Sequence, residues 1–217
     1  MPKLVDHDKR REELADAALQ IIAREGMRGV TTRAVADESG WSTGVLTHYF
    51  GTLNDLLLAA LRRAAALQGQ VFREHRSKVQ LNALERLRLI LESILPLDDR
   101  RVALTRIFSV YFAEVGVNPA TREEVTTYLR NWRRLVERTI IAGQEDGSIT
   151  TTRDPTDLTI DLVAFTDGIS IHAAIDPQIL NDLMAETDPS TRILREVLQL
   201  DSNANAQPRS RSIDQDA

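Results

Sequence analysis

Apolar residues recur at helical spacing along most of the chain. The first such stripe follows the i, i+3, i+4, i+7, i+8 pattern of an amphipathic helix and consists of Leu14, Ala17, Ala18, Ile21 and Ile22. The same periodicity predicts further helices over residues 53–76, 84–95, 99–115, 119–145, 155–175 and 193–198. No segment has a competing strand pattern, so the pattern predicts an all-α fold.

Prolines mark where several of these helices begin. An Asn or Asp side chain can cap the first free N–H groups of a helix, and proline fits the first helical position because its missing N–H costs nothing there. Four such pairs occur, at Asn118-Pro119, Asp154-Pro155, Asp176-Pro177 and Asp188-Pro189. Each pair predicts a helix start, whereas Pro96 predicts the end of the helix before it.

The segment 155–175 is apolar on two faces. Leu158, Leu162 and Phe165 follow one stripe, while Ile160 and Ile171 lie off it. A helix that is apolar on two faces must bury both. We therefore expect one face to pack in the chain's own core and the other against a second subunit. Segments 155–175 and 189–200 are the predicted dimer interface.

Two short helices are predicted between Gly29 and Phe50. Thr31 or Thr32 can cap a helix over 33–39, Gly40 suits a turn with positive φ, and Ser42 can cap a second helix. Two helices joined by such a turn form a helix-turn-helix. The second helix would expose Thr43, Gly44, Thr47 and His48. A helix of this kind can enter the major groove of DNA.

These residues resemble the N-terminal domain of the TetR family of bacterial transcription regulators. The resemblance covers about residues 9–60 and rests on Ala17-Ala18, Ile21-Ile22, Gly26, Thr31-Thr32, Val35-Ala36, Gly40, Ser42, Gly44-Val45-Leu46, Tyr49-Phe50 and Asp55-Leu56. The remainder is similar to the BetI-type C-terminal domain, through Phe112-Ala113-Glu114, the helix of Trp132, Asp167-Gly168 and Ile175-Asp176-Pro177. The resemblance implies a DNA-binding domain over 1–52 and a helical effector-binding and dimerisation domain over 53–200. The polar composition from Asp201 onward predicts a disordered tail over 201–217.

Two sets of candidate site residues follow. The candidate DNA contacts are Thr32, Arg33, Ser42, Thr43, Gly44, Thr47, His48, Tyr49 and Thr52. Most family members have a Lys after the small polar residue that follows the Tyr-Phe pair, whereas here Thr52 is followed by Leu53. The helix N-terminus at Thr52 would have to offer its N–H groups to a phosphate instead. Candidate residues for an effector pocket are Phe108, Tyr111, Phe112, Trp132, Phe165 and His172, although a plain core or interface role stays open for each.

The charge distribution is compatible with DNA binding despite a formal net charge of −5. Residues 1–76 hold 11 basic and 10 acidic side chains, whereas 77–217 hold 16 and 22, so the acidity lies away from the predicted DNA-binding surface. The stretch 42–50 contains no Asp or Glu. With few cations near the groove, we expect a shallow salt dependence.

Several functional classes are not supported by the composition. The chain has no Cys, which excludes disulfides and thiol chemistry, and its four His are too far apart in sequence for a metal site. We find no catalytic triad, dyad or phosphate-binding loop, so neither an enzyme nor a cofactor is expected. No uninterrupted apolar run reaches the roughly 18 residues of a membrane span, and the polar N-terminus is not a secretory signal. We expect a cytoplasmic protein with no membrane partner.

The sequence therefore predicts a homodimeric regulator. In the TetR family such a protein is usually a repressor that binds a palindromic operator and is released by a small molecule. The alternative, suggested by Leu53 and the weak positive charge, is a helical dimeric interaction module that does not bind DNA.

Overall fold

The computed structural model describes residues 7–76, 81–184 and 188–199. The described residues are helical and contain no strand, which confirms the predicted all-α class. The elements are α1 (His7–Glu25), the short 3-10 helix η1 (Met27–Gly29), α2 (Thr32–Ser39), α3 (Thr43–Tyr49), α4 (Leu53–Arg76), α5 (Ala83–Glu92), α6 (Asp99–Glu114), α7 (Pro119–Asp146), α8 (Pro155–Ile175), α9 (Gln178–Met184) and α10 (Pro189–Leu198).

The helix boundaries follow the polar and proline signals in the sequence. Asn118, Asp154 and Asp188 each accept N–H groups of the helix that follows, and proline occupies the first turn in all three cases. Asp176 accepts the N–H of Gln178 at the start of α9. One expected boundary differs. The helix over 84–95 ends at Glu92, because its last residues tighten into a turn before Pro96.

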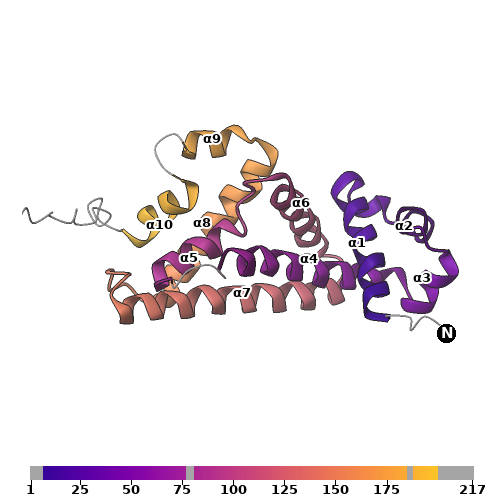
Figure 1. Ribbon diagram of the computed structural model, residues 1–217, viewed down its shortest axis with the longest axis horizontal. Coiled ribbons are helices and arrows are strands. Elements are labelled where there is room, and N and C mark those ends of the chain that lie inside the picture. Colours follow the sequence, from indigo (N-terminus) through magenta and orange to yellow (C-terminus); the bar gives the residue numbers. More distant parts are fainter. Residues whose placement is uncertain (1–6, 77–80, 185–187, 200–217) are drawn as a thin grey trace, which may run out of the picture.

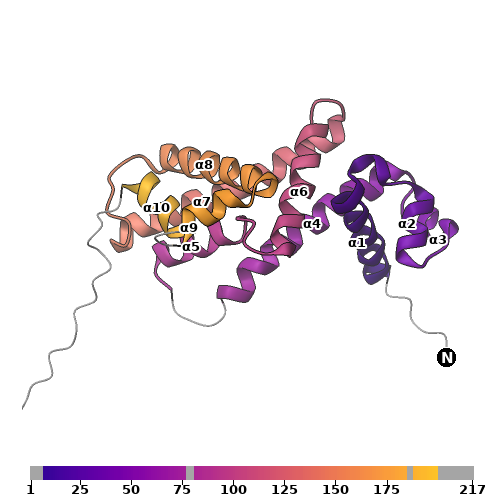
Figure 2. The ribbon, with the colours of Figure 1, turned by 90° about the horizontal axis from the view of Figure 1, so that it is seen from above.

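Figures 1 and 2 show an elongated molecule in which α1, α2 and α3 form one end. Helix α4 leaves this end and runs into the rest of the chain alongside α7. Helices α5, α8, α9 and α10 gather at the opposite end, while α6 lies between the two. Because α4 takes part in both ends, a displacement of α4 at one end is transmitted to the other.

The apolar core consists of two clusters. The first joins α1–α4 to α6 and the start of α7, and its largest fully buried side chains are Tyr111 and Phe50. The second joins α5, the later part of α7, α8 and α10. The packed unit around α1–α3 therefore extends beyond residue 52, where the sequence placed the domain boundary. The predicted tail 201–217 lies outside the described residues.

Helix α8 is apolar on two faces, as its sequence predicts, but Phe165, which was expected on the stripe of Leu158 and Leu162, is exposed. Leu158, Leu162 and Val163 are buried in the second cluster, whereas Ile160 and Ile175 remain 56% and 80% exposed. Among the described residues, α8 alone has the length and mean hydropathy of a membrane-crossing helix. No uninterrupted apolar run marks α8 in the sequence, because polar residues, among them three Asp, lie within it. Its packing against α7, α10 and α6 is that of a core helix.

Candidate nucleic-acid interface and ligand cavity

Local sequence signals fix the geometry of the helix-turn-helix. The Thr31 hydroxyl accepts the Ala34 N–H at 3.1 Å and caps α2, so Thr31 rather than Thr32 is the cap. Gly40 ends α2 at φ 72°, a conformation that a residue with a Cβ atom adopts only with strain. The Ser42 hydroxyl then accepts the Val45 N–H at 3.3 Å and caps α3. The two caps and Gly40 thus fix where α2 begins and ends and where α3 begins.

The packing of α2 and α3 decides which face of α3 is outward. Val35, Ala36 and Leu46 are buried. The residues of the α3 surface that reach solvent are Ser42, Thr43, Gly44, Thr47 and His48. Arg33 and Thr52 are exposed beside them, while Thr32 and Tyr49 are half-buried. The candidate contacts on α3 itself therefore share one exposed face, as a groove-reading helix requires.

Thr47 and Arg33 keep hydrogen-bonding capacity that their contacts within the described residues do not use. The Thr47 hydroxyl donates to the Thr43 carbonyl at 2.9 Å, which leaves its oxygen lone pairs and its methyl group for a base edge. Arg33 is 91% exposed in its side chain, and its one ion pair within the described residues is with Asp37, with 3.9 Å between Nε and Oδ2. Since exposed ion pairs of this kind contribute little, the Arg33 guanidinium is available to a phosphate or a guanine.

Helix α1 holds the end of α3 in place. Arg11 donates to the Tyr49 carbonyl at 2.6 Å, and its guanidinium lies 4.4 Å from the centroid of the Phe50 ring. The Tyr49 hydroxyl lies 3.0 Å from His7 Nδ1. Tyr49 is therefore tied to α1 on two sides, and its hydroxyl already has a partner. Its predicted phosphate contact would require this hydroxyl to share or exchange the His7 contact.

The structure occupies part of the phosphate site that the sequence predicts at the N-terminus of α4. The Thr52 N–H and hydroxyl both donate to Asp55 Oδ2, at 2.9 and 2.8 Å, and the Asp55 N–H donates back to the Thr52 hydroxyl at 3.1 Å. This reciprocal cap takes up the N–H groups of Thr52 and Asp55 and places a carboxylate at the N-terminus of α4. Leu53, which replaces the usual Lys, packs against the first core cluster instead of facing a phosphate.

Sequence reasoning missed the cations of α1 that border α3. Arg10 lies 3.3 Å from the centroid of the Trp41 ring, and Arg11 lies over Phe50 as described above. Both arginines contact the aromatic residues that flank α3 and carry a positive charge at this end of the molecule. The run Lys9-Arg10-Arg11 was a visible signal in the sequence. Its proximity to Trp41 and Phe50 follows only from the packing of α1 against α2 and α3.

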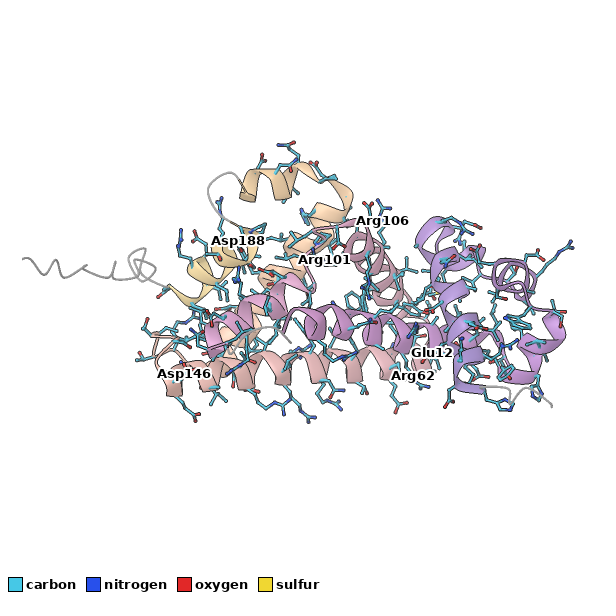
Figure 3. The ribbon with its side chains drawn as sticks, viewed as in Figure 1. Glu12, Arg62, Arg101, Arg106, Asp146 and Asp188 are labelled. Atoms are coloured by element: carbon cyan, nitrogen blue, oxygen red, sulfur yellow. The ribbon has the colours of Figure 1, made fainter. Side chains whose placement is uncertain are left out.

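Polar contacts join this DNA-binding end to the rest of the molecule through α4. Arg63 of α4 makes a two-pronged ion pair with Asp16 of α1, at 2.8 and 2.9 Å. Arg62, the preceding residue, makes a similar pair with Glu124 of α7, at 2.9 and 2.8 Å. Figure 3 labels Arg62 of α4 and Glu12 of α1, and Glu12 makes an ion pair with Arg63 at 3.3 Å. Helix α4 is therefore joined by ion pairs to both α1 and α7.

A cavity with two adjoining chambers lies between α4, α6, α7 and α8. The outer chamber, of about 360 Å³, lies between α4 and α7 and has the Arg62–Glu124 pair in its wall. The inner chamber, of about 40 Å³, extends between α6 and α8. The residues that line both chambers are Gln68, Ser93, Tyr128 and Trp132. A mostly apolar cavity with a few polar groups is the usual form of a small-molecule site.

Half of the predicted pocket residues line this cavity. Phe108 and Phe112 belong to the inner chamber, and Trp132 lines both chambers. The structure places the other three elsewhere. Tyr111 is buried in the first core cluster, where its hydroxyl donates to the Leu57 carbonyl at 2.5 Å. Phe165 and His172 lie exposed on the outer face of α8, because the 3.6-residue period turns them away from the cavity.

Sequence reasoning missed the polar residues of the cavity. Gln68 accepts a hydrogen bond from the Tyr128 hydroxyl at 2.5 Å, and burial raises the pKa of that hydroxyl above its ordinary value. Asp167 and Ser170 of α8 line the inner chamber. Because these residues come from α4, α7 and α8, no local motif connects them. Within the described ranges, no group of three His, Cys, Asp or Glu side chains is placed to hold a metal ion.

The two halves of the chain match two family models. Residues 14–60 match the model described as bacterial regulatory proteins of the tetR family, and residues 83–201 match that of the BetI-type transcriptional repressor C-terminal domain. The transcriptional regulator PksA of Bacillus subtilis is 28% identical over 186 residues, which are 83% of this chain and 86% of PksA. The regulator BetI of Paraburkholderia phytofirmans is 28% identical over 122 residues, which are 56% of this chain and 63% of BetI.

Solved structures share the fold. A transcriptional regulator from Saccharomonospora viridis in complex with choline superposes with a TM-score of 0.70 at 24% identity, over 88% of this chain and 94% of that one. The multidrug binding protein EbrR in complex with imidazole gives a TM-score of 0.58 at 26% identity, over 89% and 90% of the two chains. Together with an exposed α3 on a helix-turn-helix, these matches confirm the resemblance: the chain belongs to the TetR family of bacterial DNA-binding transcriptional regulators, a family without enzymatic activity, and carries a BetI-type C-terminal domain.

Proposed function

We propose that this protein is a cytoplasmic, homodimeric repressor that binds a palindromic operator and leaves it when a small molecule enters the cavity. The observation that carries the proposal is the continuous exposed face of α3. Thr43, Gly44 and Thr47 would contact base edges, and His48 and Arg33 would contact bases or phosphates. Repression, rather than activation, is supported by the match of residues 83–201 to a repressor domain.

The exposed apolar face of α8 supports a dimer. Its exposed residues Ile160, Ile171 and Ile175 follow one stripe of the helix together with the small residues Ala164 and Gly168, and the exposed Phe165 lies to one side of this stripe. A contiguous apolar stripe of this kind is a common subunit contact, and small residues allow two helices to approach closely. In α10, by contrast, Ile193, Leu194, Val197 and Leu198 are buried in the chain's own core. Helix α10 would therefore contribute mainly through its polar face.

The route from the cavity to the DNA runs along α4. Gln68 of α4 lines both chambers, and Arg63, little more than a turn away, holds α1 through Asp16. A ligand that prefers a shifted α4 would change the separation of the two α3 helices in the dimer. Operator affinity falls only if the ligand binds this shifted state more tightly than the DNA-bound state. The relatives that bind choline and imidazole support a small organic effector for this cavity.

A gel shift with the DNA that flanks the protein's own gene tests the proposal. The wild-type dimer should retard this DNA in a sequence-specific manner at about 50 mM salt. Thr47→Ala should weaken binding by about tenfold, since a base contact contributes about 1–3 kcal/mol. Thr126→Ala, at an exposed threonine of α7, is the matched control and should bind as the wild type does.

Both variants should remain dimers in analytical ultracentrifugation. Equal operator affinity of the Thr47→Ala variant and the wild type would remove α3 from the interface. A folded dimer that shifts no DNA would instead favour a helical interaction module without DNA binding.

A further inference from the structure

Two residues that line the inner chamber each carry a buried polar atom that has no hydrogen-bond partner within the described residues. These atoms are the indole Nε1 of Trp132 and the hydroxyl oxygen of Ser170. Buried polar groups in proteins are nearly always paired, so each unpaired atom calls for an explanation. Trp132 Nε1 can only donate, whereas the Ser170 hydroxyl can both donate and accept. A molecule that fits this chamber should therefore carry an acceptor, which an oxygen atom provides.

Asp167 adds an unpaired charge to the same chamber. It lies one helical turn before Ser170 on α8, and no hydrogen bond or ion pair within the described ranges reaches its carboxylate. Burial raises the pKa of Asp167 to about 6, although the charge of Arg133 on α7 opposes this shift. The carboxylate is therefore mostly ionised at pH 7.5, with its acceptor sites unused. A half-buried carboxylate of this kind is stabilised by a cation that also donates hydrogen bonds.

The other walls of the cavity suit a cation. Phe108 and Tyr128 are stacked with 4.7 Å between their ring centroids, and Phe112 and Trp132 line the same chamber. Aromatic faces attract cations through their quadrupole. In the wall of the outer chamber, Arg62 and Glu124 neutralise one another. Asp167 is thus the charge without an ion-pair partner among the residues that line the two chambers.

We propose that the cavity binds a small protonated amine that also carries an oxygen acceptor. The ammonium N–H would donate to Asp167 between the aromatic walls, and the oxygen would accept from Trp132 Nε1. A neutral ligand would leave the carboxylate without a counter-ion, and an anion would be repelled by it. A quaternary ammonium would supply the charge but no N–H, so it would leave the acceptor sites of Asp167 unused. This inference rests on the proposed function, because it names the chemical class of the effector.

Isothermal titration of the full-length protein with three molecules of similar shape tests this proposal. N,N-dimethylethanolamine is a cation with one N–H at pH 7.5, choline is a cation without one, and 3-methylbutan-1-ol is neutral. We expect the amine to bind about tenfold or more tightly than the alcohol, as a charge-assisted hydrogen bond predicts, and more tightly than choline. Equal binding of the alcohol, binding of choline as tight as that of the amine, or no binding of the amine at millimolar concentration overturns the proposal.

Variants locate the bound amine. Asp167→Asn preserves the shape of the side chain and should lower the affinity for the amine about tenfold, while the affinity for the alcohol stays the same. Asp157→Asn, at an exposed position on the same helix, is the matched control and should bind as the wild type does. An unchanged amine affinity in the Asp167→Asn variant would place the ligand elsewhere.

The test separates this proposal from the proposed function. Operator binding by the ligand-free protein is measured by gel shift without any amine. A protein that binds its operator and is released by a neutral or anionic molecule would refute the amine and retain the repressor. The same gel shift also shows whether the Asp167→Asn variant folds, since a folded variant should bind the operator as the wild type does.

Discussion

The raised pKa of the half-buried Asp167 carboxylate leads to a quantitative prediction about the stability of the fold. Burial raises its pKa from the ordinary 3.8 to about 6 in the folded protein. Because the folded state holds this proton more tightly than the unfolded state, the side chain favours folding below the unfolded pKa. That contribution is lost as the pH rises through about 6. Asp167→Asn removes the ionisation and keeps the shape of the side chain.

The magnitude follows from the difference between the two pKa values. Each pKa unit corresponds to about 1.4 kcal/mol, so the ionised carboxylate costs up to about 3 kcal/mol at pH 7.5. Asp167 is half-buried, and solvent screening lowers the expected figure to about 2 kcal/mol. We therefore expect Asp167→Asn to raise the free energy of unfolding by about 2 kcal/mol at pH 7.5. The gain should shrink to about 1 kcal/mol at pH 4.5, where the folded carboxyl is already protonated.

Urea unfolding of both proteins at 25 °C, followed by circular dichroism at the two pH values, measures this difference. The m-values should agree, so that a change in midpoint reports stability alone. Asp157→Asn is the control for the loss of one negative charge on α8, and it should show no such gain at pH 7.5. The reasoning fails if Asp167→Asn is less stable than the wild type at pH 7.5, or if its gain is the same at both pH values.

Three further predictions concern the dimer and the DNA-binding surface. Phe165→Glu places a charge on the exposed apolar face of α8 and should give a monomer by sedimentation, whereas an unchanged dimer would place the interface elsewhere. Arg11→Gln removes the bond to the Tyr49 carbonyl and the contact with Phe50, so operator affinity measured by fluorescence anisotropy should fall about fivefold or more. A full operator affinity in that variant would show that α1 does not position α3. The salt dependence of operator binding should correspond to no more than about six released counterions per subunit, and a steeper slope would contradict the sparse charge of α3.

Local signals in the sequence were enough to predict most of the helix-turn-helix. Thr31, Gly40 and Ser42 act on backbone groups within three residues, so their roles do not depend on the rest of the fold. The face of α3 was equally readable, because the burial of Leu46 fixes which residues point outward. The same local reasoning did not foresee the reciprocal cap between Thr52 and Asp55, which takes up the N–H groups of these two residues at the start of α4.

The cavity could be predicted only in part. The aromatic residues Phe108, Phe112 and Trp132 were predicted from the sequence and do line the cavity. A periodic apolar pattern, however, does not show whether a residue faces a cavity, the core or solvent. Tyr111 and Phe165, both proposed for the pocket, are respectively buried in the core and exposed on α8. Gln68, Asp167 and Ser170 come from helices distant in sequence, and they meet only because α4, α7 and α8 pack around one space.

The sequence by itself determined the helices, their caps and the family, because these depend on periodicity and on neighbouring residues. Tertiary structure alone decided the contacts between helices. It placed Arg11 against Tyr49 and Phe50, and it packed Leu53 into the core. It also left the Asp167 carboxylate without a partner in the cavity wall. The physical reason is that the surroundings of a side chain, and hence its pKa and its free hydrogen-bonding capacity, are set by residues far from it in the chain.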